Sequence, residues 1–178
     1  NITGVCIMLM DDGLDTGPEL LRLKRKIFST DTAGDLYDDL AALGAPLMVE
    51  AVRGVNGGTL TAKAQPESGI TYASKIEKAD ERIEWRLSAT ELDRQIRGNS
   101  PLPGMGCRWN EERIKILFAE PLAENTKWQP GTILDDRLLV SCGEGSLRLI
   151  RLQRPGKSPL KAEDFLRGTP IFSGVVLT

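Results

Sequence analysis

Residues 5–18 read VCIMLMDDGLDTGP, a run of six apolar residues followed by a loop rich in Asp and Gly. A continuous apolar run bounded by turn residues is typical of a strand covered on both faces in an α/β sheet. Loops at the carboxyl ends of such strands are where α/β sheets bind ligands. We therefore expect a buried strand over residues 5–10. From the residues alone, the loop at 11–17 fits either a ligand site or an ordinary Asp/Gly turn.

An amphipathic helix is predicted downstream of this loop, after a second strand region at 20–28. The tetrapeptide TAGD at 32–35 fits the capping-box pattern, with Asp at its fourth position. Behind it, four leucines recur at spacings of four, three and four, which places them on one helix face: Leu36, Leu40, Leu43 and Leu47. We expect the helix to run to about Gly54. Two strands and one helix are too few to stand alone, so residues 1–58 are interpreted as the remnant of a larger α/β domain.

The texture of the chain changes in its second half. We interpret residues 59–80 as a linker. The tetrapeptide SATE at 88–91 is a capping box that predicts a short helix. Short apolar runs separated by turn residues then predict closely spaced strands at 114–118, 132–134, 138–142 and 147–152, and a last helix is expected at 162–167. Residues 81–178 are therefore expected to form a small β-barrel domain with an initial helix.

Composition limits the chemistry. The chain has no histidine, which excludes His-based triads and makes a metal site improbable, so we expect no metal. Three widely spaced cysteines suit a reducing compartment. Neither a secretion signal nor an apolar run of membrane-spanning length occurs, so we expect a cytoplasmic protein without membrane contact. The chain also starts without Met, which we interpret as a cut.

Several short motifs resemble one family. The loop MDDGLDTG at 10–17 resembles the MDxGLDTG loop of the folate-dependent formyltransferases, in the version that acts on methionyl-tRNA. Further blocks follow in the order of the family: DTAGDL at 31–36, TYASKI at 71–76, RIEW at 82–85, IRGNSPLPG at 96–104, QRPGK at 153–157 and DFL at 164–166. Together these blocks are specific, and the last ones separate this version from those acting on sugars or glycinamide ribonucleotide.

The resemblance implies a Rossmann-like formyltransferase domain followed by an OB-like barrel. It implies transfer of a formyl group from the co-substrate 10-formyltetrahydrofolate to the amino group of methionyl initiator tRNA. Asp15 matches the catalytic aspartate of the family, whose partners there are an Asn and a protonated His that stabilise an oxyanion. Four residues whose backbone would face the pterin ring are the expected folate site: Asp11, Asp12, Gly13 and Leu14.

The chain departs from the family in one large respect. Neither the Asn nor the His can be placed, so we expect this chain to lack the N-terminal catalytic half and to be inactive alone. The alternative is a stand-alone tRNA-binding protein derived from the family. A third reading, a different formyltransferase, is disfavoured by the closing Pro-Gly-Lys.

Basic residues give the expected tRNA contacts. Residues 1–80 carry 8 Lys/Arg and 12 Asp/Glu, whereas residues 81–178 carry 15 and 13. Lys75, Lys78 and Arg82 lie at the linker, where an acceptor arm could pass, and Lys157 lies in the closing motif. Phosphate contacts by such residues would give salt-dependent affinity. A solvated surface of mixed charge is the alternative, and we expect a monomer.

Overall fold

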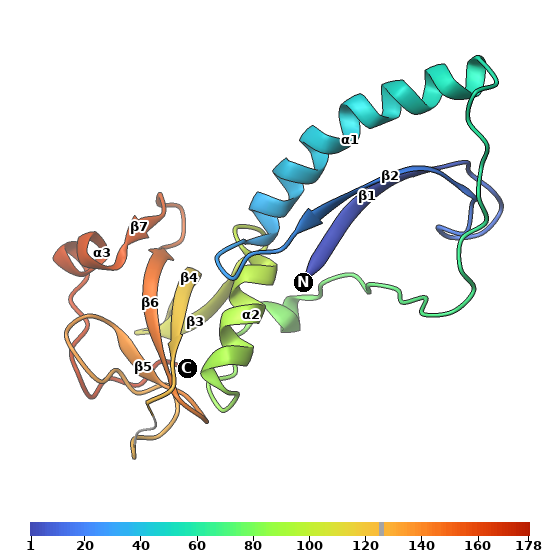
Figure 1. The fold of residues 1–178 in the computed structure, drawn as a ribbon. Helices are drawn as coiled ribbons and strands as arrows, with labels where there is room; N and C mark the ends of the chain where they lie inside the picture. The colour runs from blue at the N-terminus through green and yellow to red at the C-terminus, as the bar shows by residue number, and fades with distance from the viewer. Residues whose placement is uncertain (125–126) are drawn as a thin grey trace. The chain divides into compact units, whose positions relative to one another are not determined.

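The computed structural model describes residues 1–124 and 127–178. The chain forms two compact units, Asn1–Ser74 and Lys75–Thr178 (Figure 1). Each unit has its own sheet, so no strand of the described residues is shared between them. The first unit combines strands with one long helix, and the second unit is rich in strands.

The first unit is a two-stranded sheet with one long helix. Strand β1 (Ile2–Met8) pairs antiparallel with β2 (Glu19–Lys26), and helix α1 (Ala33–Asn56) runs along both strands (Figure 1). Ile7, Leu47 and Ala51 form its buried core, because every fourth or third residue of the helix faces the sheet. The predicted helix is confirmed, and it extends two residues beyond the expected end.

Strand β1 is not covered on both faces, which corrects the expectation of a fully buried strand. Val5 is half-buried and Ile7 is buried on the side that α1 covers, whereas Ile2, Gly4 and Cys6 are exposed. The reason is that one helix can cover only one face of a two-stranded sheet. Helix α1 likewise exposes large apolar side chains away from the sheet: Tyr37, Met48, Val49, Val52 and Val55.

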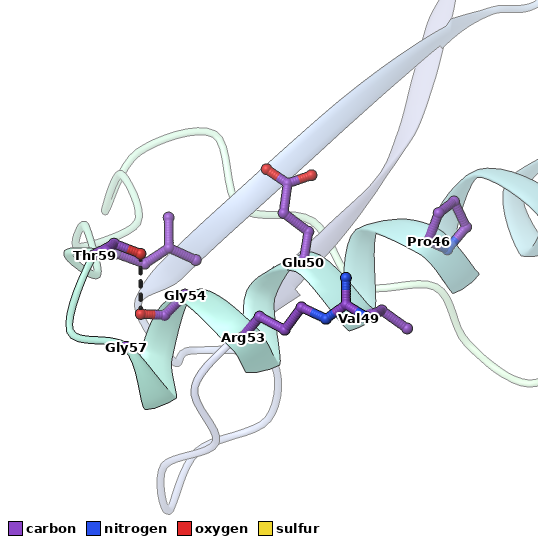
Figure 2. A pocket seen from close by; sticks show the side chains of 8 residues that line it. Pro46, Val49, Glu50, Arg53, Gly54, Gly57 and Thr59 are labelled. Atoms are coloured by element: carbon purple, nitrogen blue, oxygen red, sulfur yellow. Dashed lines mark hydrogen bonds between the residues drawn. The ribbon is translucent and has the colours of Figure 1, made fainter.

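The carboxyl end of α1 closes on the segment that follows it. The amide of Gly57 donates to the carbonyl of Arg53 at 2.9 Å, and the Thr59 hydroxyl donates to the carbonyl of Gly54 at 3.3 Å (Figure 2). An open hollow of about 760 Å³ lies here, lined mainly by apolar atoms of Pro46, Val49 and Leu60. No residue of the 11–17 loop lines this hollow, so it belongs to the scaffold of the unit.

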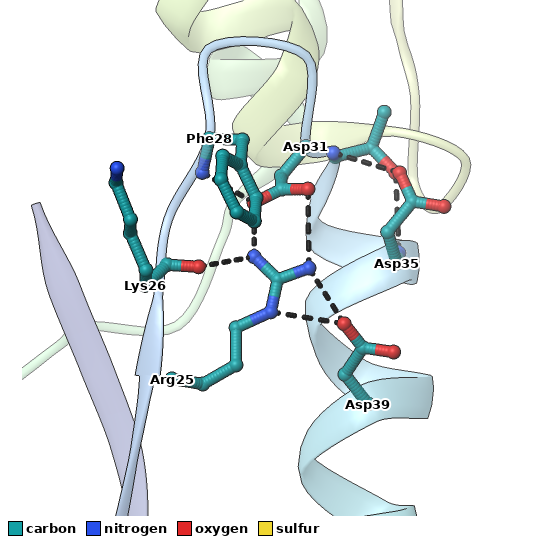
Figure 3. Close-up of polar contacts among 7 residues, drawn as sticks. Arg25, Lys26, Phe28, Asp31, Asp35 and Asp39 are labelled. Atoms are coloured by element: carbon teal, nitrogen blue, oxygen red, sulfur yellow. Dashed lines mark hydrogen bonds and ion pairs between the residues drawn. The ribbon is translucent and has the colours of Figure 1, made fainter.

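The amino end of α1 is tied to β2 by Arg25. Its guanidinium pairs with Asp31 just before the helix and with Asp39 in the second turn of the helix, the latter at 2.6 Å (Figure 3). The ring of Phe28 lies over the same guanidinium, 5.4 Å from its carbon to the ring centroid. The predicted capping box is present, because Thr32 and Asp35 exchange side-chain and backbone hydrogen bonds.

The segment interpreted as a linker is divided between the two units. Leu60 packs against the first core, and Lys63 exchanges backbone hydrogen bonds of 2.8 and 2.7 Å with Glu19. The boundary between the units falls after Ser74 rather than across 59–80, because backbone pairing with β2 holds this segment on the first unit.

The second unit is built on an antiparallel sheet. Its strands are β3 (Met105–Trp109), β4 (Glu112–Leu122), β5 (Leu139–Ser141), β6 (Ser146–Gln153) and β7 (Leu160–Lys161), in the order β3-β4-β6-β5 with β7 on β6 (Figure 1). Helix α2 (Ala89–Asn99) packs against β4 and buries Leu92 and Ile96. The short η1 (Lys78–Glu81) precedes it, and α3 (Ala162–Gly168) follows β7 and buries Phe165.

The sheet of the second unit is open, so the expected OB-like barrel is not confirmed. Strands β3 and β5 are its opposite edges, and within residues 1–124 and 127–178 they do not pair. Strand β5 has only three residues, and the chain beside it meets the C-terminal segment through single bridges, such as Thr132 with Val176. These bridges cover the edge without closing the sheet.

Most elements predicted for the second unit are confirmed. The runs at 114–118, 138–142 and 147–152 correspond to β4, β5 and β6, and both capped or terminal helices are present. Residues 132–134 form only isolated bridges at Thr132 and Ile133. Strand β3 was not predicted, because its sequence MGCRW has no clear alternation, yet Met105 and Cys107 are buried.

Candidate functional site

The loop at 11–17 leaves β1 and returns directly into β2. The amide of Leu9 donates to the carbonyl of Pro18 at 3.0 Å and closes the base of the loop. Inside it, the Asp11 carboxylate accepts from the Gly13 amide at 3.2 Å and from the Thr16 hydroxyl at 2.6 Å. This Asp11-centred turn fixes the first half of the loop.

Both glycines of the loop are required by close contacts. A Cβ at Gly17 would overlap the carbonyl oxygen of Leu9, and one at Gly13 would overlap the Thr16 hydroxyl. Asp15 adopts a left-handed backbone with φ of 57°, a conformation that Asp tolerates better than most residues. The sequence of the loop therefore matches its unusual backbone position by position.

The side chains of the loop face solvent. Four residues of the loop are exposed, and Leu14 exposes 70% of its surface: Asp11, Asp12, Leu14 and Asp15. The carboxylate of Asp15 has neither a hydrogen bond nor an ion pair within the described residues. Its carboxylate is therefore available to a ligand or to another part of a larger protein.

A second segment, missed by the sequence analysis, holds this loop from outside. The side-chain amide of Gln65 donates to the carbonyls of Asp15 at 2.9 Å and of Gly17 at 2.7 Å. The hydroxyl of Tyr72 donates to the carbonyl of Leu14 at 3.3 Å. Between loop and segment lies a cavity of about 610 Å³, lined by Asp15, Thr16 and residues 64–72.

The expected tRNA contacts are exposed and unpaired. Lys75, Lys78, Arg82 and Lys157 are all exposed, and none of them forms an ion pair with another residue of the described chain. Lys75, Lys78 and Arg82 lie at the start of the second unit. Lys157 lies far along the sequence, so these residues form two separate groups in the chain.

Lys157 sits in a turn fixed by its neighbours. The Arg154 guanidinium donates two hydrogen bonds of 2.8 Å to the Glu112 carboxylate on β4. These hydrogen bonds lower the pKa of the Glu112 carboxyl. The Gln153 amide donates to the carbonyl of Lys157 at 2.7 Å, and Gly156 supplies the left-handed backbone. The QRPGK motif therefore forms a turn held by hydrogen bonds, with the Lys157 side chain exposed to solvent.

Other basic residues of the second unit are already engaged. Arg97 pairs with Asp93, and Arg148 pairs with Asp135. By contrast, Arg151 on β6 lies directly opposite Lys161 on β7, and both are exposed. Two like charges in one cross-strand pair repel each other, so this position favours an anion.

Over residues 1–124 and 127–178, His, Cys, Asp and Glu side chains nowhere gather in a group of three or more that could hold a metal ion. In the same residues, every helix is too short or too polar to cross a membrane.

Comparison with known proteins places the chain in a family. Residues 1–52 match the model for formyl transferase, and residues 75–170 match the model for the formyl transferase C-terminal domain. The boundary between the two matches lies near that between the two compact units. The chain belongs to the formyltransferase family, as the sequence motifs indicated.

Curated relatives show which kind of formyltransferase the chain is similar to. The chain is 50% identical over 172 residues to a methionyl-tRNA formyltransferase of Rhodopseudomonas palustris, and 49% identical over 175 residues to that of Ruegeria pomeroyi. These matches cover 94% and 98% of the chain but 55% and 57% of the relatives. The chain therefore spans about half the length of the curated relatives it matches.

Solved structures share the fold at low identity. HypX from Aquifex aeolicus, in complex with tetrahydrofolic acid, superposes with a TM-score of 0.67 at 18% identity, over 99% of this chain and 34% of that one. The N-formyltransferase from Helicobacter canadensis gives a TM-score of 0.65 at 21% identity, over 86% of this chain and 56% of that one. These likenesses support the fold.

Proposed function

We propose that this chain is the C-terminal part of an enzyme that transfers a formyl group from 10-formyltetrahydrofolate to the amino group of methionyl initiator tRNA. The observation that carries the proposal is the exposed loop at 11–17, which presents an unpaired Asp15 carboxylate at the end of β1. Identity of about 50% to methionyl-tRNA formyltransferases over nearly the whole chain supports the choice of acceptor.

Asp15 is the catalytic residue of this proposal. The amine of the acceptor attacks the formyl carbon and gives a tetrahedral oxyanion, which collapses as the bond to the folate nitrogen breaks. The proton that the attacking amine loses is balanced by the proton that the leaving nitrogen takes up. An ionised carboxylate beside this centre favours the charged form of a neighbouring cation and can accept a proton. The oxyanion donors, an Asn and a His in the family, would come from the portion of the relatives that this chain does not span.

The same loop is the proposed folate site. Two glycines let the backbone approach a planar ring closely, and exposed Asp12 and Leu14 leave the outer side of the loop open. Asp11 is occupied in holding the turn through Gly13 and Thr16. In this proposal Asp11 shapes the loop, while the backbone from Asp11 to Leu14 faces the pterin ring.

The apolar surfaces of the first unit support a larger protein. The exposed face of β1 and the outer face of α1 carry apolar side chains that isolated soluble domains usually bury. We propose that the further part of the enzyme packs there and completes a Rossmann-like domain, and that the second unit serves as its OB-like tRNA-binding part.

A chimeric enzyme tests the proposal. The N-terminal portion of the Rhodopseudomonas palustris relative, up to the start of its match with this chain, is fused to Asn1. We expect this chimera to formylate methionyl-tRNA in the presence of 10-formyltetrahydrofolate, and the 178-residue chain alone to show no turnover. Asp15→Asn should remove activity from the chimera, whereas Asp12→Asn serves as a charge-matched control in the same loop with a smaller effect. A folded but inactive chimera would overturn the proposed function.

The alternative is tRNA binding without catalysis. The unpaired Lys75, Lys78 and Arg82 favour it, because solvated cations at one end of a unit can bind phosphates without further chemistry. Binding of tRNA by the isolated chain, together with an inactive chimera, would favour this second function.

A further inference from the structure

The side-chain amide nitrogen of Gln65 makes two hydrogen bonds to the functional loop, and a longer contact of 3.7 Å to the Met8 sulfur at the end of β1. The two acceptors are the carbonyl of Asp15 and the carbonyl of Gly17, which flank Thr16. Two carbonyl oxygens accept hydrogen bonds at this position, so the nitrogen of the Gln65 amide must face them. The amide oxygen would be repelled by both carbonyls. Both donors of one side chain thus bridge the second half of the loop.

Gln65 binds two carbonyls of the loop that the Asp11 turn leaves without a side-chain partner. Asp11 accepts from Gly13 and Thr16, whereas the carbonyls of Asp15 and Gly17 on either side of Thr16 accept from Gln65. Asp15 itself has a left-handed backbone, which is unfavourable for most residues and less so for Asp. A strained position of this kind persists only where its surroundings hold it.

Gln65 is itself anchored. Two residues earlier, Lys63 exchanges two backbone hydrogen bonds with Glu19 at the start of β2, and Gln65 is half-buried. Seven residues later, Tyr72 adds a third contact to the loop at the carbonyl of Leu14. The segment 63–72 therefore runs along the loop as a fixed brace.

We infer that Gln65 is a positioning residue for Asp15: it holds the backbone of residues 15–17 so that the free Asp15 carboxylate keeps one direction. The inference rests on the proposed function for its catalytic consequence. It assigns a role in catalysis to a segment that the sequence suggested was only a linker. Tyr72 contributes to the same brace through Leu14.

The first measurement concerns the loop in the 178-residue chain. Backbone order parameters from nitrogen relaxation should be near 0.85 at residues 15–17 and should fall below about 0.6 in Gln65→Met, which keeps length and loses both donors. Gln95→Met, at an exposed glutamine of the second unit, is the matched control and should leave these values unchanged. Unchanged order at residues 15–17 in Gln65→Met would overturn the inference.

The second measurement uses the chimera described above. Gln65→Met should lower kcat by about 10- to 100-fold, because a misplaced catalytic group loses rate rather than binding. KM for methionyl-tRNA should change by less than about threefold. If Gln65→Met lost order at residues 15–17 but kept its kcat, the positioning role of Gln65 would be refuted. The proposed function would still stand in that case if the Asp15→Asn chimera were inactive. An inactive parent chimera would refute the proposed function and the expected effect of Gln65 on kcat. The order parameters would then still show whether Gln65 holds the loop.

Discussion

Arg148 on β6 and Asp135 in the loop before β5 form a two-point ion pair, with Nη1 to Oδ1 at 2.8 Å and Nη2 to Oδ2 at 2.7 Å. Asp135 also accepts from the amides of Arg137 and Leu139, each at 2.9 Å. Burial alone would raise the pKa of this carboxyl, but the hydrogen bonds from Arg148 and the two amides outweigh it and hold the pKa at about 2. One carboxylate thus fixes the turn that leads into the edge strand.

Asp135→Asn should make the second unit less stable and less sensitive to acid. Because the folded pKa lies below the unfolded value, the ionised carboxylate stabilises the fold above about pH 4, and this stabilisation disappears as the pH falls towards about 2. We expect a loss on the order of 1–2 kcal/mol at pH 7. Urea unfolding of the second unit between pH 7 and pH 2.5 measures it.

Asp136→Asn is the control for this experiment. Asp136 is the exposed neighbour, and its carboxylate has no hydrogen bond or ion pair in the described chain. The control should unfold like the parent at pH 7. Equal losses in the two variants would show that general charge, rather than the pair with Arg148, sets the acid response.

Arg25→Met should loosen the first unit where β2 meets α1. The substitution keeps the apolar stem but leaves Asp31 and Asp39 without the guanidinium that both bind. The Arg25 side chain is only 16% exposed, so the remaining carboxylates lose a well-desolvated partner. We expect a lower free energy of unfolding and faster amide exchange over the first turns of α1.

Arg53→Met is the matched control, because Arg53 lies on the same helix, is exposed and has no ion pair within residues 1–124 and 127–178. Exchange should stay slow in this control. If Arg25→Met left both the amide exchange and the free energy of unfolding unchanged, the ion pairs of Figure 3 would not contribute to the stability of the first unit.

Local patterns in the sequence were enough for several elements, but not for the brace at Gln65. The capping boxes at Thr32 and Ser88 were predictable because their partners lie three residues away, and both are present. The contact from Gln65 to Asp15 spans 50 residues, and no local pattern encodes such a contact. The open sheet escaped prediction for the same reason, since closure depends on pairing between β3 and β5.

The exposed loop and its Asp15 were predictable because a motif and a tight turn coincide there. The motif did not show that its carboxylates differ in their contacts. The Asp11 carboxylate accepts the hydrogen bonds that hold the turn, whereas the Asp15 carboxylate has no partner among the described residues. That difference follows from where the hydroxyl of Thr16 lies, which only the folded backbone sets.

Thiol reactivity should separate the three cysteines. Cys107 and Cys142 are buried, and burial raises the pKa of each to about 12. Cys6 is exposed on the uncovered face of β1, although partial burial raises its pKa as well. Because the thiolate is the reactive form, a disulfide reagent at pH 8 should label one thiol in the native chain and three in urea.

Cys6→Ser should abolish the native signal and leave two thiols in urea. Slower labelling of Cys6 than of a free thiol is also expected, given the direction of its pKa. Rapid native labelling of Cys107 would contradict the buried position of β3.

The most demanding prediction concerns tRNA. If the proposed function holds, the isolated chain should bind tRNA weakly through phosphates, with an affinity that falls as salt is added. Two groups of unpaired cations compete for this role: Lys75 with Lys78 at the start of the second unit, and Arg151 with Lys161 across β6 and β7. Each phosphate contact removed should reduce the slope of log affinity against log salt by about 0.7 to 0.9.

The Lys75→Ala/Lys78→Ala variant should therefore bind less tightly and respond less to salt. Arg151→Ala/Lys161→Ala tests the second group in the same way, and Lys24→Ala/Lys63→Ala, exposed lysines of the first unit, is the charge-matched control. Titrations should begin at roughly 50 mM salt, where phosphate contacts are strong. A reduced slope in the first variant alone would place the tRNA at the start of the second unit. A reduced slope only in the second would move the contact to the sheet and refute the assignment of Lys75 and Lys78, and an absence of salt-dependent binding by the parent chain would refute stand-alone tRNA binding altogether.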